Sequence, residues 1–179
     1  MTSFLPRPLP HILLTALLVV IGMAFVATHS AQAAEPKIIA NYKDWSVYKV
    51  DLGGDMICYA ISKPTEKSPR AVKHGDIFFL VSSWKSGVAV NQPSLMTGYE
   101  LRAKPEPVVR IGSDKWKMFS SGSDGFIDKA SDEQRLISAM KRGANMRVSA
   151  VSQRGTATSY TFSLLGVTDA LKRVQKECR

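Results

Sequence analysis

The sequence predicts a mainly β fold: an antiparallel β-sandwich or barrel-like domain with two short helices, the second at the C-terminus. Short runs rich in β-branched and aromatic residues recur along the chain, and turns rich in Gly, Pro and Asp separate them. Only two segments have the periodicity of an amphipathic helix. The chain of 179 residues is 45% hydrophobic, which is enough to build the core of one domain.

Residues 1–33 are predicted to be a cleaved secretory signal peptide. Arg7 precedes an uncharged, apolar run over residues 12–27, and small residues lead to a cleavage site after Ala33 or one residue later. The alternative is a retained membrane anchor, but the run is shorter than the roughly 20 apolar residues that span a bilayer. We therefore expect a single mature domain, residues 34–179, in the periplasm or outer envelope and without a transmembrane segment.

The first two strands of the mature region form a predicted hairpin. Residues 42–50 are rich in aromatic and β-branched side chains, and residues 56–62 return after a turn. A loop containing two prolines is expected over residues 63–75. The short apolar run over residues 77–81 suits a strand buried on both faces, so we expect it to be the central strand.

The later strands are shorter and are separated by turns. In the last of them, Tyr160, Phe162 and Leu164 alternate with hydroxyl side chains, so one face is expected in the core. These strands are predicted at residues 88–91, 98–103, 108–111, 115–121, 145–152 and 158–164.

Two helices interrupt the strands. Ser131 and Gln134 form a predicted capping box at the start of the first helix, which Gly143 ends. The second helix is expected to run from an N-cap at Thr168 to Cys178. The predicted buried stripes are Leu136, Ile137 and Met140 in the first helix, and Leu171 and Val174 in the second.

Catalytic motifs give little support for an enzyme. Ser82-Ser83-Trp84-Lys85 matches the S-x-x-K of penicillin-recognising enzymes, but Lys85 would have to serve as two separate lysines. His74 is the only histidine of residues 34–179, and adjacent turn residues predict a solvated loop position. One histidine and two cysteines are too few for the usual zinc sites. We predict no catalytic residue, metal or cofactor, with catalysis by scattered residues around His74 or Asp124 as the alternative.

The mature region is basic. The formal charge of +9 falls to about +8 once Arg7, the one charged residue of the predicted signal peptide, is removed. The basic residues are scattered, which favours a solvated surface, and a function for them would be attachment to anionic lipids, lipopolysaccharide or polyanions. No aromatic and basic signature of nucleic-acid binding occurs. Trp45, Trp84 and Trp116 are expected in the core.

An ordered set of short motifs runs through nearly the whole mature region. The first half contains Trp45-Ser46-Val47, Cys58-Tyr59-Ala60-Ile61-Ser62-Lys63-Pro64, Phe78-Phe79-Leu80-Val81-Ser82 and Gly98-Tyr99. The second half contains Ala139-Met140-Lys141-x-Gly143, Ser152-x-Arg154-Gly155-Thr156, Phe162-Ser163-Leu164-x-Gly166, Ala170 and Cys178. In this order the motifs resemble the invasion-associated locus B family of alphaproteobacteria.

The resemblance implies a periplasmic or outer-envelope protein with a β-sandwich-like domain, and a namesake linked to entry into host red cells. It supplies no catalytic residues. We therefore expect an exported, non-enzymatic envelope protein that binds a protein or an anionic envelope surface, with peripheral membrane association and a role in host-cell interaction or envelope maintenance. The alternative is an envelope enzyme of unrecognised class that acts on cell-wall or lipid material.

Cys58 and Cys178 are predicted to form a disulfide. The compartment beyond the inner membrane is oxidising, and an exported chain with two cysteines most simply pairs them. Cys178 shares a helical face with Leu171 and Val174, so docking of that face carries its thiol towards the sheet. The alternative is two unpaired, buried thiols. Because no C-x-x-C motif is present, we expect the bond to be structural rather than redox-active.

Overall fold

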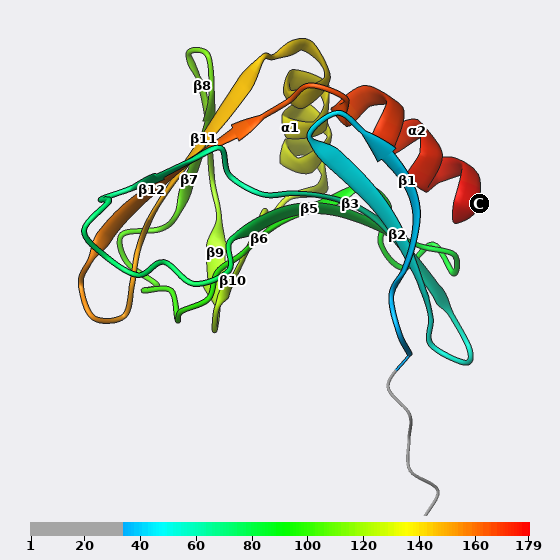
Figure 1. Cartoon of the computed structure of the whole chain (residues 1–179), viewed down its shortest axis with the longest axis horizontal. Helices are drawn as coiled ribbons and strands as arrows, with labels where there is room; N and C mark the ends of the chain where they lie inside the picture. Colours follow the sequence, from blue (N-terminus) through cyan, green and yellow to red (C-terminus); the bar gives the residue numbers. More distant parts are fainter. Residues whose placement is uncertain (1–33) are drawn as a thin grey trace, which may run out of the picture. The chain divides into compact units, whose positions relative to one another are not determined.

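The computed structural model describes residues 34–179 (Figure 1). The predicted signal peptide and its cleavage site lie outside the described residues. Residues 34–179 contain twelve strands in two antiparallel sheets and two helices, the second at the C-terminus. The predicted fold class is therefore confirmed. Across this part of the chain, no helix is long and apolar enough to cross a membrane.

The larger sheet has seven strands in the order β1-β2-β3-β5-β6-β10-β9. Its middle strand is β5, in which the five residues from Phe79 to Ser83 are buried. The prediction of a central strand in this region is correct: β5 has a neighbouring strand on each side, and its successive residues are buried on both faces, as a continuous apolar run predicts. The strands are β1 (Lys37–Tyr42), β2 (Trp45–Asp51), β3 (Met56–Ser62), β5 (Phe78–Trp84), β6 (Gln92–Met96), β9 (Phe119–Ser121) and β10 (Asp124–Phe126).

The smaller sheet has five strands in the order β4-β12-β11-β7-β8. Alternate residues of β11 and β12 are buried, so one face of this sheet lies in the core and the other faces solvent. The strands are β4 (Glu66–Ser68), β7 (Val108–Ile111), β8 (Asp114–Lys117), β11 (Asn145–Val151) and β12 (Ala157–Ser163).

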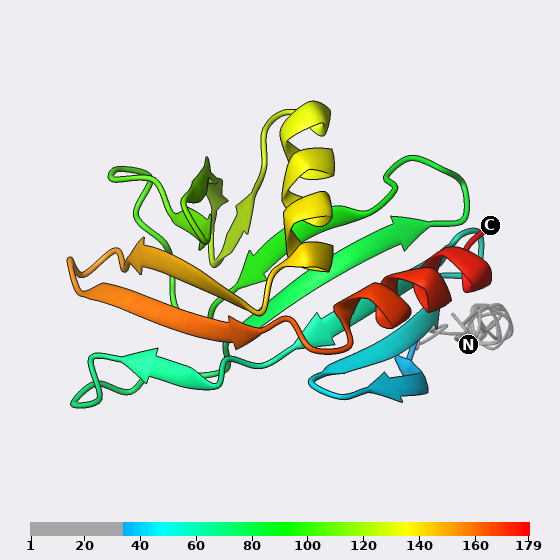
Figure 2. The same ribbon diagram turned by 90° about the horizontal axis from the view of Figure 1, so that it is seen from above.

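The core joins the two sheets and the helices α1 (Ala130–Arg142) and α2 (Val167–Glu177). Phe79 of β5 meets Phe162 of β12 edge to face, with ring centroids 5.8 Å apart. Trp45 is fully buried and donates its indole N–H to the Ser163 carbonyl at 3.0 Å. Both helices lie on one side of the larger sheet, and α2 packs against β1, β2, β3 and β5 (Figures 1 and 2).

Several predicted strands differ from the observed ones. The predicted strand 115–121 is divided at buried Met118 into β8 and β9, which belong to different sheets. Residues 88–91 form a bend in which Val88 is 78% exposed, and the strand begins at Gln92 instead. In residues 98–103 the only pairing is a single bridge from Leu101 to Ser152. The strand β1, apart from its last residue Tyr42, and the strand β10 lie outside the predicted strands, and β4 lies within the predicted loop over residues 63–75.

The helix starts also differ from the predicted caps. The N-cap of α1 is Lys129, and Ser131 lies inside the first turn, so the predicted capping box is absent. The N-cap of α2 is Gly166 rather than Thr168, with a φ of 91°. A Cβ at Gly166 would collide with the backbone of Tyr42, so close packing against the β1–β2 turn decides where this helix begins.

Candidate functional site

The disulfide predicted from the sequence is present. Cys58 of β3 and Cys178, which follows α2, are joined with a Cα–Cα separation of 5.8 Å. Leu171 and Val174 are fully buried on the same face of α2, as the helical spacing predicts. The bond therefore ties the C-terminal helix to the larger sheet.

His74 is buried, with 8% of its surface exposed, so the prediction of a solvated loop histidine is wrong. The loop before β5 folds back until the backbones of Gly75 and Gly98 touch, and a Cβ at Gly98 would lie 2.9 Å from the Asp76 nitrogen. This close approach carries His74 inwards. Its Nε2 lies 2.9 Å from the Pro69 carbonyl oxygen, and its Nδ1 lies 3.0 Å from the Tyr160 hydroxyl.

A chain of hydroxyl groups continues from His74. The Tyr160 hydroxyl is 2.8 Å from that of Tyr99, and the Tyr99 hydroxyl is 2.7 Å from Oγ1 of Thr158. Thr158 also donates to the Ala150 carbonyl at 3.2 Å. The chain thus links the loop before β5, the segment after β6 and the strand β12.

The Pro69 carbonyl at one end of this hydrogen-bonded network limits where its protons can lie. The Pro69 carbonyl can only accept, so Nε2 of His74 carries a proton. In the neutral imidazole Nδ1 accepts from Tyr160, and the three hydroxyl protons of Tyr160, Tyr99 and Thr158 then serve three of the four contacts between Nδ1 and the Ala150 carbonyl. Burial, helped by the hydrogen bond to Tyr99, raises the pKa of Tyr160 well above its ordinary value. Both imidazole nitrogens are therefore engaged, and Tyr160 stays a neutral phenol at physiological pH.

A cleft of about 700 Å³ opens over this network. Lys73 and Arg154 contribute positive charge to its lining, and Glu100 contributes one carboxylate. The turn between β11 and β12 supplies further amide and hydroxyl groups. Such a lining suits a polar ligand. The residues that line the cleft are Val72, Lys73, His74, Gly98, Tyr99, Glu100, Ser152, Gln153, Arg154, Thr156 and Thr158.

Asp124, the other residue considered for catalysis, is not part of this cleft. It lies on β10 between Met96 of β6 and Ser121 of β9. Its buried Oδ1 has no hydrogen-bond partner within residues 34–179, and burial raises the pKa of this carboxyl. The structure therefore does not bring Asp124 and His74 together.

The S-x-x-K match has no catalytic geometry. Ser82 and Ser83 are buried within β5, and Ser83 accepts a hydrogen bond from the Asn91 backbone at 2.9 Å. Lys85 is exposed in the following turn. Penicillin-recognising enzymes combine this lysine with a second one, whereas here both motif elements would share Lys85. In the described part of the chain, no three His, Cys, Asp or Glu residues are grouped as metal ligands would be.

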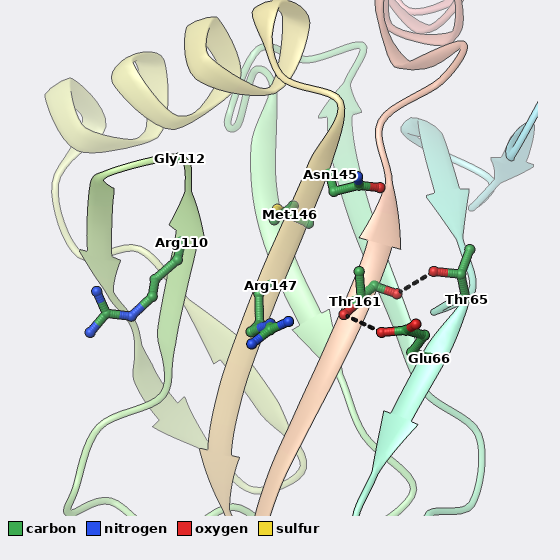
Figure 3. Close-up of a pocket in the computed structure, with 8 residues that line it drawn as sticks. All are labelled: Thr65, Glu66, Arg110, Gly112, Asn145, Met146, Arg147 and Thr161. Carbon is green, nitrogen blue, oxygen red and sulfur yellow. Dashed lines mark hydrogen bonds between the residues drawn. The ribbon is translucent and has the colours of Figure 1, made fainter.

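A line of polar residues crosses the outer face of the smaller sheet. Strand pairing places Lys115 of β8 opposite Arg110 of β7, and Arg110 opposite Arg147 of β11. Arg147 in turn is opposite Thr161 of β12, and Thr161 is opposite Glu66 of β4. Figure 3 shows Arg110 and Arg147 on neighbouring strands, with Thr161 joined to Glu66 by a hydrogen bond of 3.2 Å.

We name Lys115, Arg110 and Arg147 the cationic row. All three residues are exposed, and no carboxylate of residues 34–179 lies within 4.0 Å of their charged groups. The two arginines border a hollow of about 540 Å³, to which Glu66 and Thr161 also contribute. Sequence reasoning missed the row because its residues come from three strands. The only available signal was the alternation of charged with apolar residues in each strand.

Comparison with known proteins identifies a family. The family model described as "Invasion associated locus B (IalB) protein" matches residues 45–175. No curated protein and no solved structure matches the chain significantly. The match covers every strand except β1, the His74 network and most of α2. The chain therefore belongs to the invasion-associated locus B family.

Proposed function

We propose that residues 34–179 form an exported, non-enzymatic envelope protein of the invasion-associated locus B type, which acts by binding. The observation that carries this proposal is the state of the polar groups in and beneath the cleft above His74. His74, Tyr160, Tyr99 and Thr158 are hydrogen-bonded to one another or to backbone carbonyls. A catalytic base or nucleophile must contact the reacting atom of the substrate, whereas these groups form their hydrogen bonds within the fold.

The disulfide supports the location. A bond between Cys58 and Cys178 persists in an oxidising compartment, whereas cytosolic thiols are kept reduced. This agrees with the predicted signal peptide and with a site of action in the periplasm or outer envelope. A role in host-cell interaction or in envelope maintenance follows from the family and is part of the proposal.

One observation favours the alternative of an envelope enzyme. The cleft above His74 brings an imidazole, the Tyr99 phenol and charged side chains together, and buried Tyr160 is hydrogen-bonded to both His74 and Tyr99. Enzymes place their reacting groups in such clefts. A substrate that displaced the Tyr160 hydroxyl from Nδ1 of His74 would free that nitrogen for proton transfer. The two functions therefore predict different behaviour of the same residue.

The test measures binding and turnover with the same preparations. Exported protein, with its disulfide intact, is titrated onto isolated cell envelopes and, separately, incubated with purified cell wall and extracted lipids. We expect saturable binding that excess unlabelled protein displaces. We also expect no new product by mass spectrometry relative to a sample without protein.

His74→Gln is the diagnostic variant, because glutamine retains hydrogen bonding but cannot exchange protons as imidazole does. Tyr48→Phe serves as the control, since the Tyr48 hydroxyl makes no hydrogen bond with residues 34–179. Under the binding function, both variants bind envelopes as the wild type does. A product formed by the wild type and by Tyr48→Phe, but not by His74→Gln, would establish the enzyme instead.

A further inference from the structure

We propose that the cationic row docks on the phosphate groups of an anionic phospholipid bilayer. This inference rests on the proposed function and deepens it, because it names the envelope component that the protein contacts and the face that contacts it. The row consists of Lys115, Arg110 and Arg147, on the outer face of the five-stranded sheet.

The first argument is the uncompensated charge of the row. Directly opposed residues on neighbouring strands have Cβ atoms about 4.5–5.5 Å apart, and like charges in that arrangement repel. The nearest acid along the same line is Glu66. Thr161 lies between Glu66 and Arg147 and donates a hydrogen bond to the Glu66 carboxylate. An external anion would relieve this repulsion, so the row is complementary to negative charge.

The contrast with neighbouring basic residues strengthens this argument. Lys117 lies two residues from Lys115 but pairs with Glu106 at 3.2 Å, and Lys104 shares the same carboxylate at 2.6 Å. Asp114 lies next to Lys115 in sequence, yet it belongs with Trp116 beside α1. The fold thus pairs Lys117 and Lys104 with a carboxylate and leaves the row unpaired.

The second argument is the chemistry around the row. Ser149 and Ser159 are directly opposed on β11 and β12, two residues along from Arg147 and Thr161. Guanidinium groups and hydroxyls are the donors that bind phosphate oxygens, and arginine does so with two parallel hydrogen bonds. The face therefore offers both charge and hydrogen bonds to a phosphate.

The third argument decides between a lipid surface and a protein. The outward positions of these five strands carry no aromatic side chain, whereas protein interfaces depend on aromatic anchors in buried pockets. An extended row on a sheet face presents its three charges to a plane together. The outward residues are Glu66, Ser68, Val108, Arg110, Lys115, Lys117, Asn145, Arg147, Ser149, Val151, Ala157, Ser159 and Thr161.

The experiment compares two triple variants of the exported protein. The row variant carries Arg110→Gln, Arg147→Gln and Lys115→Gln. The control variant carries Lys37→Gln, Lys85→Gln and Lys176→Gln, which removes the same net charge from exposed positions on other elements. Binding is measured by co-sedimentation with phosphatidylcholine vesicles, with and without phosphatidylglycerol, at several salt concentrations. Thermal unfolding confirms that each variant is folded.

We expect the wild type to bind only the vesicles that contain phosphatidylglycerol, and binding to weaken as salt rises. Each basic residue near an anionic surface adds a similar increment to the free energy of binding. Because the row variant lacks three of them, it should bind on the order of 100-fold more weakly. The control variant should stay within about threefold of the wild type, since its charges lie outside the five-stranded sheet, and screening weakens their attraction to a lipid on that sheet.

Three outcomes would overturn the inference. Equal losses in both triple variants would leave only an unspecific effect of net charge. Binding to soluble polyphosphate or lipopolysaccharide, but not to phospholipid vesicles, would assign the row to another anion. Saturable binding to isolated envelopes without binding to vesicles would refute the lipid surface and leave the proposed binding function intact. Absence of binding to both envelopes and vesicles would refute the lipid surface and the binding function.

Discussion

The side chains of His74 and Asp124 differ in whether their buried polar atoms have hydrogen-bond partners. His74 is satisfied on both ring nitrogens, by the Pro69 carbonyl and by Tyr160, so its burial costs the fold little. Oδ1 of Asp124 is buried without a hydrogen-bond partner in residues 34–179, so no hydrogen bond offsets the cost of its desolvation. The sequence offers both residues as catalytic candidates, but burial costs little at His74 and destabilises the fold at Asp124.

Replacement of Asp124 by asparagine should stabilise the protein at neutral pH. Burial raises the pKa of Asp124 in the folded state above the unfolded value of about 3.9, so the folded state binds its proton more tightly. The wild type therefore loses stability as pH rises from about 4 through that raised pKa. Asp124→Asn carries no such penalty, and its melting temperature should exceed that of the wild type at pH 7.

The advantage of Asp124→Asn should disappear below about pH 4, where the wild-type carboxyl is protonated in both states. Asp128→Asn is the matched control, because Asp128 is exposed four residues away. Melting curves between pH 3 and pH 8 make the comparison. A constant difference across that range would show that the effect does not come from ionisation.

At the scale of the element, local pattern and tertiary position disagree where the chain changes sheets. Residues 115–121 have the composition of one strand, yet β8 pairs with β7 and β9 pairs with β10 in the other sheet. Buried Met118 stands at the division, and its backbone N–H donates to the Pro107 carbonyl at 2.9 Å. Propensity describes extended backbone equally well on both sides of such a corner.

The Cys58–Cys178 disulfide joins the end of the C-terminal helix to the larger sheet. The Cys58–Cys178 bond spans 120 residues, and loop entropy predicts that its loss costs about 4–5 kcal/mol of unfolding free energy. Urea denaturation of the oxidised and reduced protein measures this difference. Hydrogen exchange should show the amides of α2 losing protection first on reduction, because the bond joins that helix to β3.

The Cys58→Ala/Cys178→Ala double variant separates the bond from other effects of the reductant. Its stability should match that of the reduced wild type and should not change when reductant is added. Equal stability of oxidised and reduced wild type would contradict a stapling role for the disulfide.

For the whole molecule, the main prediction concerns processing and attachment. Protein recovered from the envelope should begin at Ala34 or Glu35, because the predicted signal peptidase site follows Ala33 or the next residue. High salt should release it from membranes, since attraction between surface charges is screened within about 10 Å at 0.1 M salt. Intact mass spectrometry and stepwise salt washing make the two measurements.

Retention of residues 1–33, together with release only by detergent, would contradict this prediction. It would support instead the alternative in which the apolar run over residues 12–27 remains as a membrane anchor. Unrelated peripheral and integral proteins of the same membranes serve as controls: salt should release the peripheral proteins, and only detergent should release the integral ones.

By itself, the sequence determined the mainly β class, the central strand, the C-terminal helix, the pairing of Cys58 with Cys178 and the family. These features depend on local composition, short periodicities or the chemistry of two unique residues, which can be read along the chain. Only the tertiary structure decided the burial of His74, the cleft above it and the cationic row. Each of these depends on residues that are distant in sequence, and strand register and close backbone approach, which bring them together, have no local signature.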